Sequence, residues 1–508
     1  MTAPPAAAPR AYAPGLRTAL VLTGSGTAGA YHAGVLRAFT EAGVKIDLVA
    51  GTGMGAVSAL FAAIDGGSAL WGADGLWRSP STSRFYRVRA AVRIGAWALA
   101  ASLSVVLLPL AALALGLLVY PLGFVMRLAG ASAGSAIVRA YTTFVAATFD
   151  PAFLPSALPR AFLMAMVLFA GTLAVLALVV LARGGGRRRD DAPIWWRIVG
   201  APLSSSAAGR AVTGALWQLL GGAAGARQPD RVELGRAYTD LLRENVGQPG
   251  FRELVLTVHD LDMRRDLVFA LLGERTRREF FRAGVPDRRL AEGFDLTGAG
   301  RDHLIGVVLA SVTLPVATEV RLLEFPPESF WCGESHRVTS RPGALDRVLS
   351  ELRLAGIEQV ILVSPFPELD GPHRLTVPRG DWRGRVSDYL AGAEAAAVRA
   401  ATGSADRFRG VYLVAPPYNP VGPLDLGGCY DQRSDRVVTV AELIDRGYSD
   451  AYCEFIDPVV GASGERLTIE GGAGNGAPAP EPMPRPRLGL VEAEEDATGG
   501  GPAEGAES

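Results

Sequence analysis

Residues that bind metals or form disulfides are scarce in this chain of 508 residues, which has three cysteines and five histidines. Cys332, Cys429 and Cys453 lack the spacing of a metal site, and an odd number cannot all pair within one chain. This fits a reducing compartment. The histidines are scattered and do not form a metal-ligand pattern. We therefore expect no metal and no other cofactor.

Lysine and net charge are also nearly absent. Lys45 is the only lysine among 50 basic residues, and the formal net charge is -1. Without an excess of positive charge, the sequence predicts no nucleic-acid partner. Residues 1–15 lack the apolar stretch of a signal peptide, so we predict a disordered N-terminus there. Residues 461–508 are mostly Gly, Ala, Pro and Glu and predict a disordered acidic tail.

A serine is missing from the turn Gly51-Thr52-Gly53-Met54-Gly55. Residues 46–50 predict a buried strand before this turn and residues 56–64 predict a helix after it, which is the context of a G-x-S-x-G nucleophile elbow. In such an elbow the central residue has a strained backbone that exposes its hydroxyl. Gly53 stands at that position, and glycine supplies no nucleophile.

A second glycine turn follows a predicted strand over residues 18–23. It reads Gly24-Ser25-Gly26-Thr27-Ala28-Gly29 and leads into a helix with Gly34-Val35-Leu36. Two such strand-turn-helix units resemble the start of the patatin-like phospholipase family, whose first turn is an oxyanion loop. The resemblance implies that Gly24, Ser25 and Gly26 form this loop and that Gly51 and Gly55 flank the elbow. The chain differs from the family in having Ser25 for a glycine, Ala28 for a basic residue and Gly53 for the serine.

The resemblance continues downstream in the predicted strands 254–261, 359–364 and 410–416 and in the helix end 309–315. The family's catalytic aspartate would fall near residues 331–342. Counting back eight residues from Pro342 gives Glu334, whereas matching the adjacent glycine gives Cys332. We favour Glu334 as the base position. The implied fold is a three-layer α/β sandwich with a mainly parallel sheet.

A dinucleotide-binding fold is the rival interpretation, because Gly24-x-Gly26-x-x-Gly29 after a strand also fits that fingerprint. That fold needs an acidic residue at the end of the second strand to bind the ribose. Asp47 has suitable spacing but begins its strand, so its side chain is expected at the opposite edge of the sheet. This argues against nucleotide binding.

Two further polar residues near the turns need an interpretation. His32 lies on the first predicted helix, and we expect it on the helix surface, without a catalytic role. Ser25 and Ser58 are the serines close to the elbow in sequence. Ser25 belongs to the oxyanion loop and Ser58 lies one turn into a helix, so we do not expect either to replace the missing nucleophile.

Two long apolar runs interrupt the α/β pattern. Residues 94–126 and 161–182 carry no formal charge, and a bilayer crossing needs about 20 apolar residues. The second run fits one crossing. The first is longer, and Pro109 divides it, so it forms either one kinked helix or a re-entrant hairpin. We predict a membrane insertion over residues 86–229 between two parts of one α/β domain, residues 16–85 and 230–460.

Both parts of the α/β domain must share one sheet, so the chain has to cross the membrane an even number of times. This favours the kinked helix for residues 94–126. Arginines are concentrated before the first run and after the second, at residues 78–93 and 183–189, and are sparse between the runs. By the positive-inside rule the α/β domain is cytoplasmic and the protein lies in the cytoplasmic membrane.

Two functions remain in view. One is a membrane-bound lipid acyl hydrolase, with a different serine as the nucleophile. The other, which we favour, is a lipid-binding pseudoenzyme that keeps the family's scaffold without its Ser-Asp dyad. Its expected partners are the membrane and a membrane lipid or acyl ester.

Overall fold

A computed structural model describes residues 12–152, 154–184, 200–221, 228–283, 286–298, 300–367, 380–403 and 407–460. The expected disordered tail, 461–508, lies outside these residues, as do residues 1–11 of the expected disordered N-terminus. The N-terminal boundary is corrected at Tyr12, whose side chain is buried. The Tyr12 hydroxyl donates to the Lys45 carbonyl at 2.9 Å, and its ring centroid lies 5.6 Å from that of Phe455.

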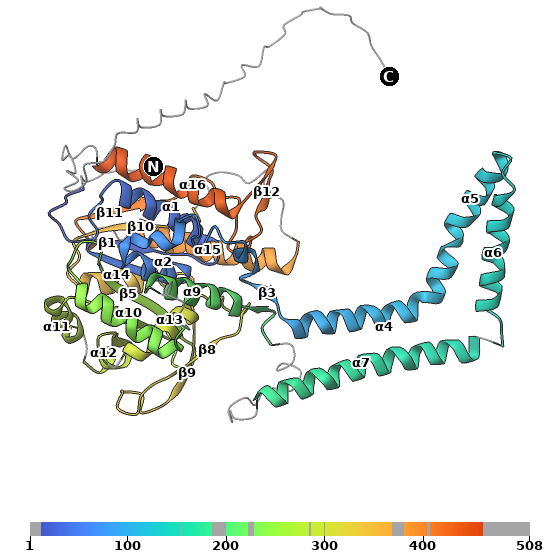
Figure 1. The fold of residues 1–508 in the computed structure, drawn as a ribbon, viewed down its shortest axis with the longest axis horizontal. Helices are drawn as coiled ribbons and strands as arrows, with labels where there is room; N and C mark the ends of the chain where they lie inside the picture. Colours follow the sequence, from blue (N-terminus) through green and yellow to red (C-terminus); the bar gives the residue numbers. More distant parts are fainter. Residues whose placement is uncertain are drawn as a thin grey trace, which may run out of the picture. The chain divides into compact units, whose positions relative to one another are not determined.

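Within the described residues the central sheet has nine strands (Figure 1). Seven follow the order β11-β10-β1-β2-β5-β6-β7, and β9 pairs with both β5 and β8. Their bounds are β1 Thr18–Leu22, β2 Leu48–Thr52, β5 Glu253–Asp260, β6 Arg265–Leu271, β7 Gly293–Asp295, β8 Arg321–Glu324, β9 Ser335–Thr339, β10 Gln359–Val363 and β11 Gly410–Val414. Two smaller sheets pair β3 (Arg87–Val88) with β4 (Leu203–Ser204), and β12 (Cys429–Asp431) with β13 (Arg436–Val438).

The strands β11, β10, β1, β2 and β5 run parallel. The two strands predicted before the glycine turns therefore lie side by side, although β2 begins two residues later than predicted. The strands β6, β8 and β9 add antiparallel pairs at the β5 side. The expectation of a mainly parallel α/β sheet is confirmed.

Helices cover both faces of the sheet, because alternate residues of each strand point to opposite sides. Leu20 and Leu22 belong to one apolar core, and Ala19 and Val21 belong to the other. The first core includes residues of α1 (Ala28–Glu41), α2 (Met54–Ala62), α9 (Ser206–Leu219), α10 (Arg231–Asn245), α13 (Leu304–Ser311) and α16 (Val440–Ala451). The second includes residues of α11 (Glu274–Arg282), α14 (Leu345–Leu354) and α15 (Trp382–Gly403). The arrangement is compatible with a three-layer fold.

Shorter elements complete the domain. They are the helices α3 (Ser68–Trp71) and α12 (Pro286–Glu292), the 3-10 turns η1 (Asp65–Gly67), η2 (Pro80–Arg84) and η4 (Arg301–His303), and the π-helix η6 (Tyr452–Val460).

The helix α1 packs closely on α16, and glycines make the contact possible. A Cβ atom on Gly34 would lie 1.8 Å from the Ile444 carbonyl oxygen, and one on Gly447 would lie 2.2 Å from the Tyr31 oxygen. Such distances exclude any side chain, so Gly34 is required by helix packing.

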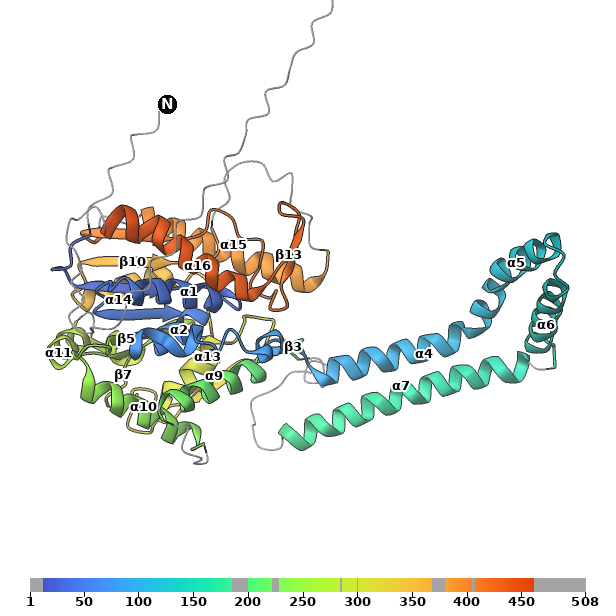
Figure 2. The ribbon, with the colours of Figure 1, turned by 45° about the horizontal axis from the view of Figure 1, so that its top comes forward.

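Four helices between β3 and β4 form an apolar arm: α4 (Ala90–Ala114), α5 (Gly116–Leu128), α6 (Ala133–Thr148) and α7 (Leu154–Gly184). Within the arm α4 lies along α7, and α5 lies along α6 (Figures 1 and 2). The first apolar run is a bent helix, because only Leu115 separates α4 from α5. The Tyr141 hydroxyl lies 3.1 Å from the Ala112 and Leu113 carbonyl oxygens, and such a contact satisfies backbone groups at a helix bend.

Two windows of the arm are long and apolar enough to cross a membrane: Leu110–Leu128 and Pro159–Leu176, each with a mean hydropathy of 1.8. Most of their side chains are exposed, since 11% of each window is buried. The sequence predicts a break in residues 94–126 at Pro109, and the bend lies six residues later, at Leu115. Because α4 packs along α7 and α5 along α6, α4 and α5 do not fold back on each other. This arrangement favours a kinked helix over a re-entrant hairpin for residues 94–126.

Candidate functional site

The turn after β2 has the backbone geometry of a nucleophile elbow. Gly53 lies between β2 and α2 with φ 61° and ψ −135°, a conformation that strains any residue with a side chain. Close backbone contacts also explain the flanking glycines. A Cβ on Gly51 would lie 2.3 Å from the Gly55 oxygen, and one on Gly55 would lie 1.9 Å from the Leu22 oxygen. The structure thus has the elbow shape with no hydroxyl at its tip.

The loop after β1 lies directly over this elbow. The Gly24 carbonyl accepts a hydrogen bond from the Met54 backbone N–H at 2.7 Å. A Cβ atom on Gly53 would lie only 2.6 Å from the same Gly24 oxygen and 3.8 Å from the Ser25 Oγ. In an active elbow the N–H after the nucleophile stabilises the oxyanion. Here that donor, Met54, already has a backbone acceptor.

Other donors of the loop remain available. Gly24 and Gly26 have positive φ values of 123° and 56°, which turn the loop sharply between β1 and α1. Among the described residues, the N–H groups of Ser25 and Gly26 find no acceptor. Successive backbone N–H groups in such a turn form a concavity that suits an anion or a polarised oxygen.

A segment that the sequence did not associate with the site, residues 419–428, packs against this loop. Pro423 accepts a hydrogen bond from the Thr27 N–H at 3.1 Å, and Gly422 accepts one from the Thr27 Oγ1 at 3.0 Å. A Cβ on Gly26 would lie 1.7 Å from the Pro423 oxygen. The segment therefore holds the loop in place over the elbow.

His32 is fully buried, which corrects the expectation that it lies on the helix surface. Its Nε2 lies 2.9 Å from the Thr23 carbonyl oxygen and must donate, because a carbonyl only accepts. Its Nδ1, 3.1 Å from the Ser58 Oγ, then accepts from that hydroxyl. Burial lowers the pKa of His32 to about 3, so the ring is neutral. Ser58 is itself fully buried, which places it out of reach of a substrate.

Glu394 is a buried carboxyl group at the same end of the sheet. It lies on α15, accepts a hydrogen bond from the Thr23 Oγ1, and is 2% exposed. Burial raises the pKa of Glu394 to about 7, although hydrogen bonds from Thr23 and the Gly343 backbone oppose the increase. Sequence reasoning missed Glu394. A signal was present, since it shares a helical stripe of buried positions with Ser387, Leu390 and Val398.

Strand register separates Glu334 from the elbow, which corrects the position obtained by counting from Pro342. Thr52 pairs with Thr257, and β5 continues three residues to Asp260, which pairs with Val338. Because β9 is antiparallel to β5, Glu334 lies four residues farther out, roughly 23 Å along the strands from Thr52. Its side chain is exposed and lies 3.1 Å from the His336 Nε2.

The end of β9 nearest in register to the elbow, and the residue directly after it, carry hydroxyl groups. Thr339 contacts the Thr313 Oγ1 at 2.8 Å, and the Ser340 Oγ donates to the Thr313 carbonyl at 2.5 Å. Cys332, the alternative base position, is exposed and precedes β9, with its Sγ 3.7 Å from the Phe330 oxygen. Neither candidate base position therefore lies beside Gly53.

The dinucleotide interpretation is not supported by the local geometry. Asp47 accepts a hydrogen bond from the Thr18 N–H at 2.8 Å, which places it at the start of β1, the edge opposite the glycine turns. Gly29, the third glycine of the fingerprint, is explained by packing, since a Cβ there would lie 2.1 Å from the Trp77 ring.

Comparisons with known proteins add only weak likeness. No protein-family model matches the chain, and no curated protein is similar to it. Among solved structures, VipD from Legionella pneumophila is 12% identical with a TM-score of 0.28; the match covers 87% of this chain and 66% of VipD. The function is therefore inferred from the geometry of the site.

Proposed function

We propose that this protein is a membrane-anchored, lipid-binding pseudoenzyme on a hydrolase-like α/β scaffold. One observation carries the proposal: Gly53 keeps the elbow conformation, while the Gly24 carbonyl occupies the space of the missing side chain and accepts the Met54 N–H. The turn keeps the backbone conformation of an elbow, but it has no nucleophile and its Met54 N–H is not free to bind an oxyanion.

Ester hydrolysis at an elbow needs a nucleophile, a base and oxyanion donors, and all three are altered. Position 53 has no hydroxyl, and strand register separates Glu334 from the turn. Met54 donates to Gly24. Loss of the nucleophile alone typically costs on the order of a million-fold in rate. We therefore expect no turnover of acyl esters at position 53.

Binding of a lipid oxygen needs hydrogen-bond donors but neither a nucleophile nor a base. The Ser25 and Gly26 N–H groups lack acceptors among the described residues, and they precede α1, whose N-terminus favours negative charge. An ester carbonyl or a headgroup oxygen has the chemistry to accept from these donors. The resemblance of both glycine turns to the patatin-like family supports an acyl lipid as the ligand.

The apolar arm supports a membrane anchor. Arm residues such as Leu117, Leu128 and Phe124 are 79%, 74% and 63% exposed, and water would disfavour such surfaces. The window Pro159–Leu176 belongs to α7, and α4 lies along α7. At about 1.5 Å per residue, α4 with 25 residues and α7 with 31 are each long enough for a bilayer of about 30 Å, while the window Leu110–Leu128 lies mostly on α5. Two crossings would return the chain to one side, and the arginine distribution supports the cytoplasm as that side.

An active hydrolase that uses Ser25 is the alternative, and one distance favours it. The Ser25 Oγ lies 3.8 Å from where a Cβ on Gly53 would stand, so a hydroxyl is close to the elbow tip. Among the described residues, however, no hydrogen bond links this hydroxyl to a base. Without such a base, a serine hydroxyl is a weak nucleophile.

The test uses the full chain purified in detergent, a fluorophosphonate probe and a p-nitrophenyl ester. We expect neither labelling nor turnover. Turnover that is lost in Ser25→Ala but kept in Ser58→Ala would show that Ser25 is the nucleophile and would refute the pseudoenzyme. A diazirine-bearing phospholipid should crosslink to residues near the Gly24-Gly26 loop. Crosslinks confined to the arm would refute lipid binding at the elbow.

A further inference from the structure

One loop of the α/β domain has a conformation that internal packing does not explain. Val316 has a φ of 65°, in the left-handed region, where a β-branched side chain is strained. The same side chain is 92% exposed. Strain of this kind usually persists where a function requires the residue.

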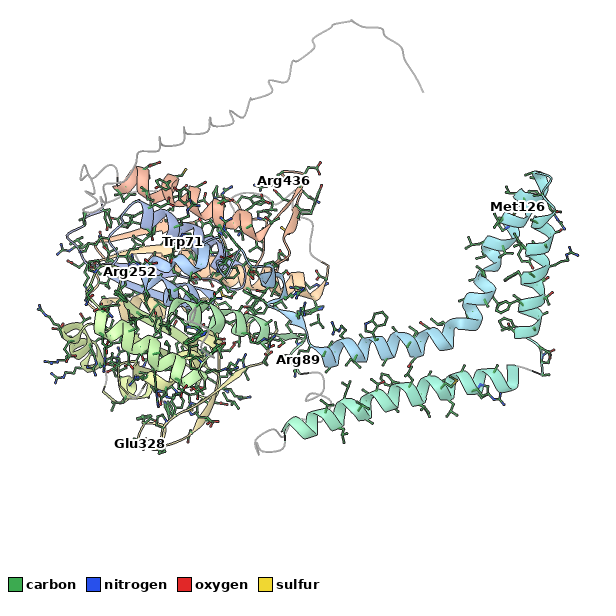
Figure 3. All side chains as sticks on the ribbon, in the orientation of Figure 1. Trp71, Arg89, Met126, Arg252, Glu328 and Arg436 are labelled. Carbon is green, nitrogen blue, oxygen red and sulfur yellow. The ribbon has the colours of Figure 1, made fainter. Side chains whose placement is uncertain are left out.

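This loop lies where the arm joins the domain. Ala317 and Thr318 directly follow Val316. The Leu203 N–H donates to the Ala317 carbonyl at 2.9 Å, and Leu203 forms an isolated β-bridge with Thr318. Leu203 also pairs with Val88 in the small β3–β4 sheet. Arg89, the next residue, donates its N–H to the Pro202 carbonyl at 3.0 Å and immediately precedes α4. Figure 3 labels Arg89 at this junction.

The start of α4 fixes how far this surface can lie from a bilayer. The uncharged run begins at Ile94, five residues after Arg89, which is about 8 Å along a helix. The chain also returns to the domain here, at residues 200–203. If the arm crosses a membrane at this run, the residues that are hydrogen-bonded to Arg89 and Leu203 lie within the headgroup region or next to it. This holds for any orientation of the arm relative to the α/β domain.

The chemistry of this surface suits anionic lipid. Val88, Val316 and Val320 are exposed aliphatic residues of the two segments that Leu203 joins, and the chain that leads into the arm carries the exposed arginines Arg84, Arg87 and Arg93. The neighbouring carboxylate, Glu319, is engaged by the Ser204 Oγ at 3.2 Å. Basic residues near a membrane surface attract anionic headgroups, and aliphatic side chains enter the acyl boundary.

We propose that Val88, Val316 and Val320, together with the arginines of the segment that leads into α4, form a membrane-contact surface of the α/β domain and that Val316 is its inserting tip. The partner is the anionic face of a bilayer. This inference rests on the proposed membrane anchor and adds a second, monotopic contact. Such a contact holds the two glycine turns of the α/β domain close to the membrane, which contains the proposed lipid ligand.

The experiment places an environment-sensitive NBD label at Val316→Cys in the full chain, with the three native cysteines replaced by alanine. The protein is reconstituted into vesicles of phosphatidylcholine with and without phosphatidylglycerol. The matched control is Val437→Cys, an exposed valine on β13, 56% exposed. We expect a blue shift and quenching by nitroxide lipids at 316 but not at 437, and stronger quenching with the anionic lipid.

The outcomes separate this inference from the proposed function. If the protein resists carbonate extraction but the label at position 316 is not quenched, the membrane anchor stands and the proposed contact surface is wrong. If carbonate extracts the protein from the vesicles, the membrane anchor itself is wrong. A second variant, Val316→Asn, tolerates a positive φ and should keep or raise the thermal unfolding midpoint in detergent. A lower midpoint would show that Val316 serves internal packing and would also overturn the inference.

Discussion

Leucine and glycine occur in both the α/β domain and the arm, and particular residues of each kind have opposite surroundings in the two regions. Leu20 and Leu22 in β1 are fully buried, whereas Leu117 and Leu118 in α5 are 79% and 70% exposed. Burial of apolar surface stabilises by about 25 cal/mol per Å², so the α/β domain gains this energy from its own fold. The arm gains it only from an apolar partner. The comparison shows that hydropathy alone does not distinguish a buried core segment from an exposed apolar one.

Two glycines, one from each region, show the same contrast. At Gly55 in the elbow, an added Cβ would meet backbone atoms, whereas at Gly171 in α7 it would meet nothing within 4 Å. Gly55 is therefore required by the close approach of two backbone segments. Gly171 is a tolerated helical residue. The predictions below test this contrast, starting from the largest expected effect.

Gly55→Ala should destabilise the α/β domain by about 3–5 kcal/mol, because its Cβ would lie 1.9 Å from the Leu22 oxygen in β1. Denaturant unfolding of the purified chain, followed by near-UV circular dichroism, measures the effect. The control is Gly171→Ala in the arm, where we expect a change within about 1 kcal/mol. Equal effects of the two variants would contradict the contrast between required and tolerated glycines.

Leu173→Arg in α7 should reduce membrane insertion of that segment by about 2.5–3.5 kcal/mol, because it places a charge in the middle of an apolar span. A glycosylation-based insertion assay measures this cost directly. The control is Leu290→Arg on α12, where the leucine is 65% exposed and an arginine stays in water. If both variants insert like the wild type, the arm does not span a membrane.

Glu394→Gln should change how the stability of the α/β domain depends on pH. Burial raises the pKa of Glu394 from 4.5 to about 7, so the folded state holds a proton that the unfolded state has released between these values. Wild-type stability therefore falls as pH rises from 4.5 to 7, by up to about 3 kcal/mol. The variant lacks this loss and should be more stable than the wild type at pH 8 and similar at pH 4.5.

Unfolding midpoints in denaturant at several pH values measure this difference. His32 acts in the opposite sense, since burial lowers its pKa from 6.5 to about 3 and its contribution is lost as pH falls below 6.5. The acid limb of the profile should therefore remain in the Glu394→Gln variant. Parallel profiles for variant and wild type above pH 5 would show that Glu394 is ionised in the fold.

The sequence predicted those parts of the fold whose signals are local. The strands β1, β2, β5, β10 and β11 are short apolar runs, of which β1 and β2 lead into the glycine turns, and the sequence predicts the start of each within two residues. The three-layer arrangement follows from such units, because parallel strands need helical crossovers. The arm was also predictable, since its uncharged runs exceed the length of a typical core helix.

Features that depend on distant partners were not predicted. His32 is buried because Thr23 and Ser58, from two other elements, satisfy both ring nitrogens. Glu334 was misplaced because counting from Pro342 ignores the antiparallel register of β9. The contact between residues 419–428 and the Gly24–Gly26 loop joins segments about 400 residues apart, and no local sequence pattern indicates such a contact.

Gly53→Ser has the smallest expected effect on stability. It is also the most direct test of whether the Gly24 carbonyl blocks chemistry at the elbow. Its Cβ would lie 2.6 Å from the Gly24 oxygen, and its backbone would keep a strained conformation, so we expect a loss of stability of about 1–3 kcal/mol. We also expect no fluorophosphonate labelling, because the Gly24 carbonyl faces the new side chain and Glu334 lies too far away to act as its base. The matched control is Gly53→Ala, which has the same steric cost without the hydroxyl and should lose similar stability. Labelling of the serine variant alone would mean that the Gly24-Ser25 peptide turns away from the elbow readily, freeing the Met54 N–H, and that position 53 lacks only its nucleophile.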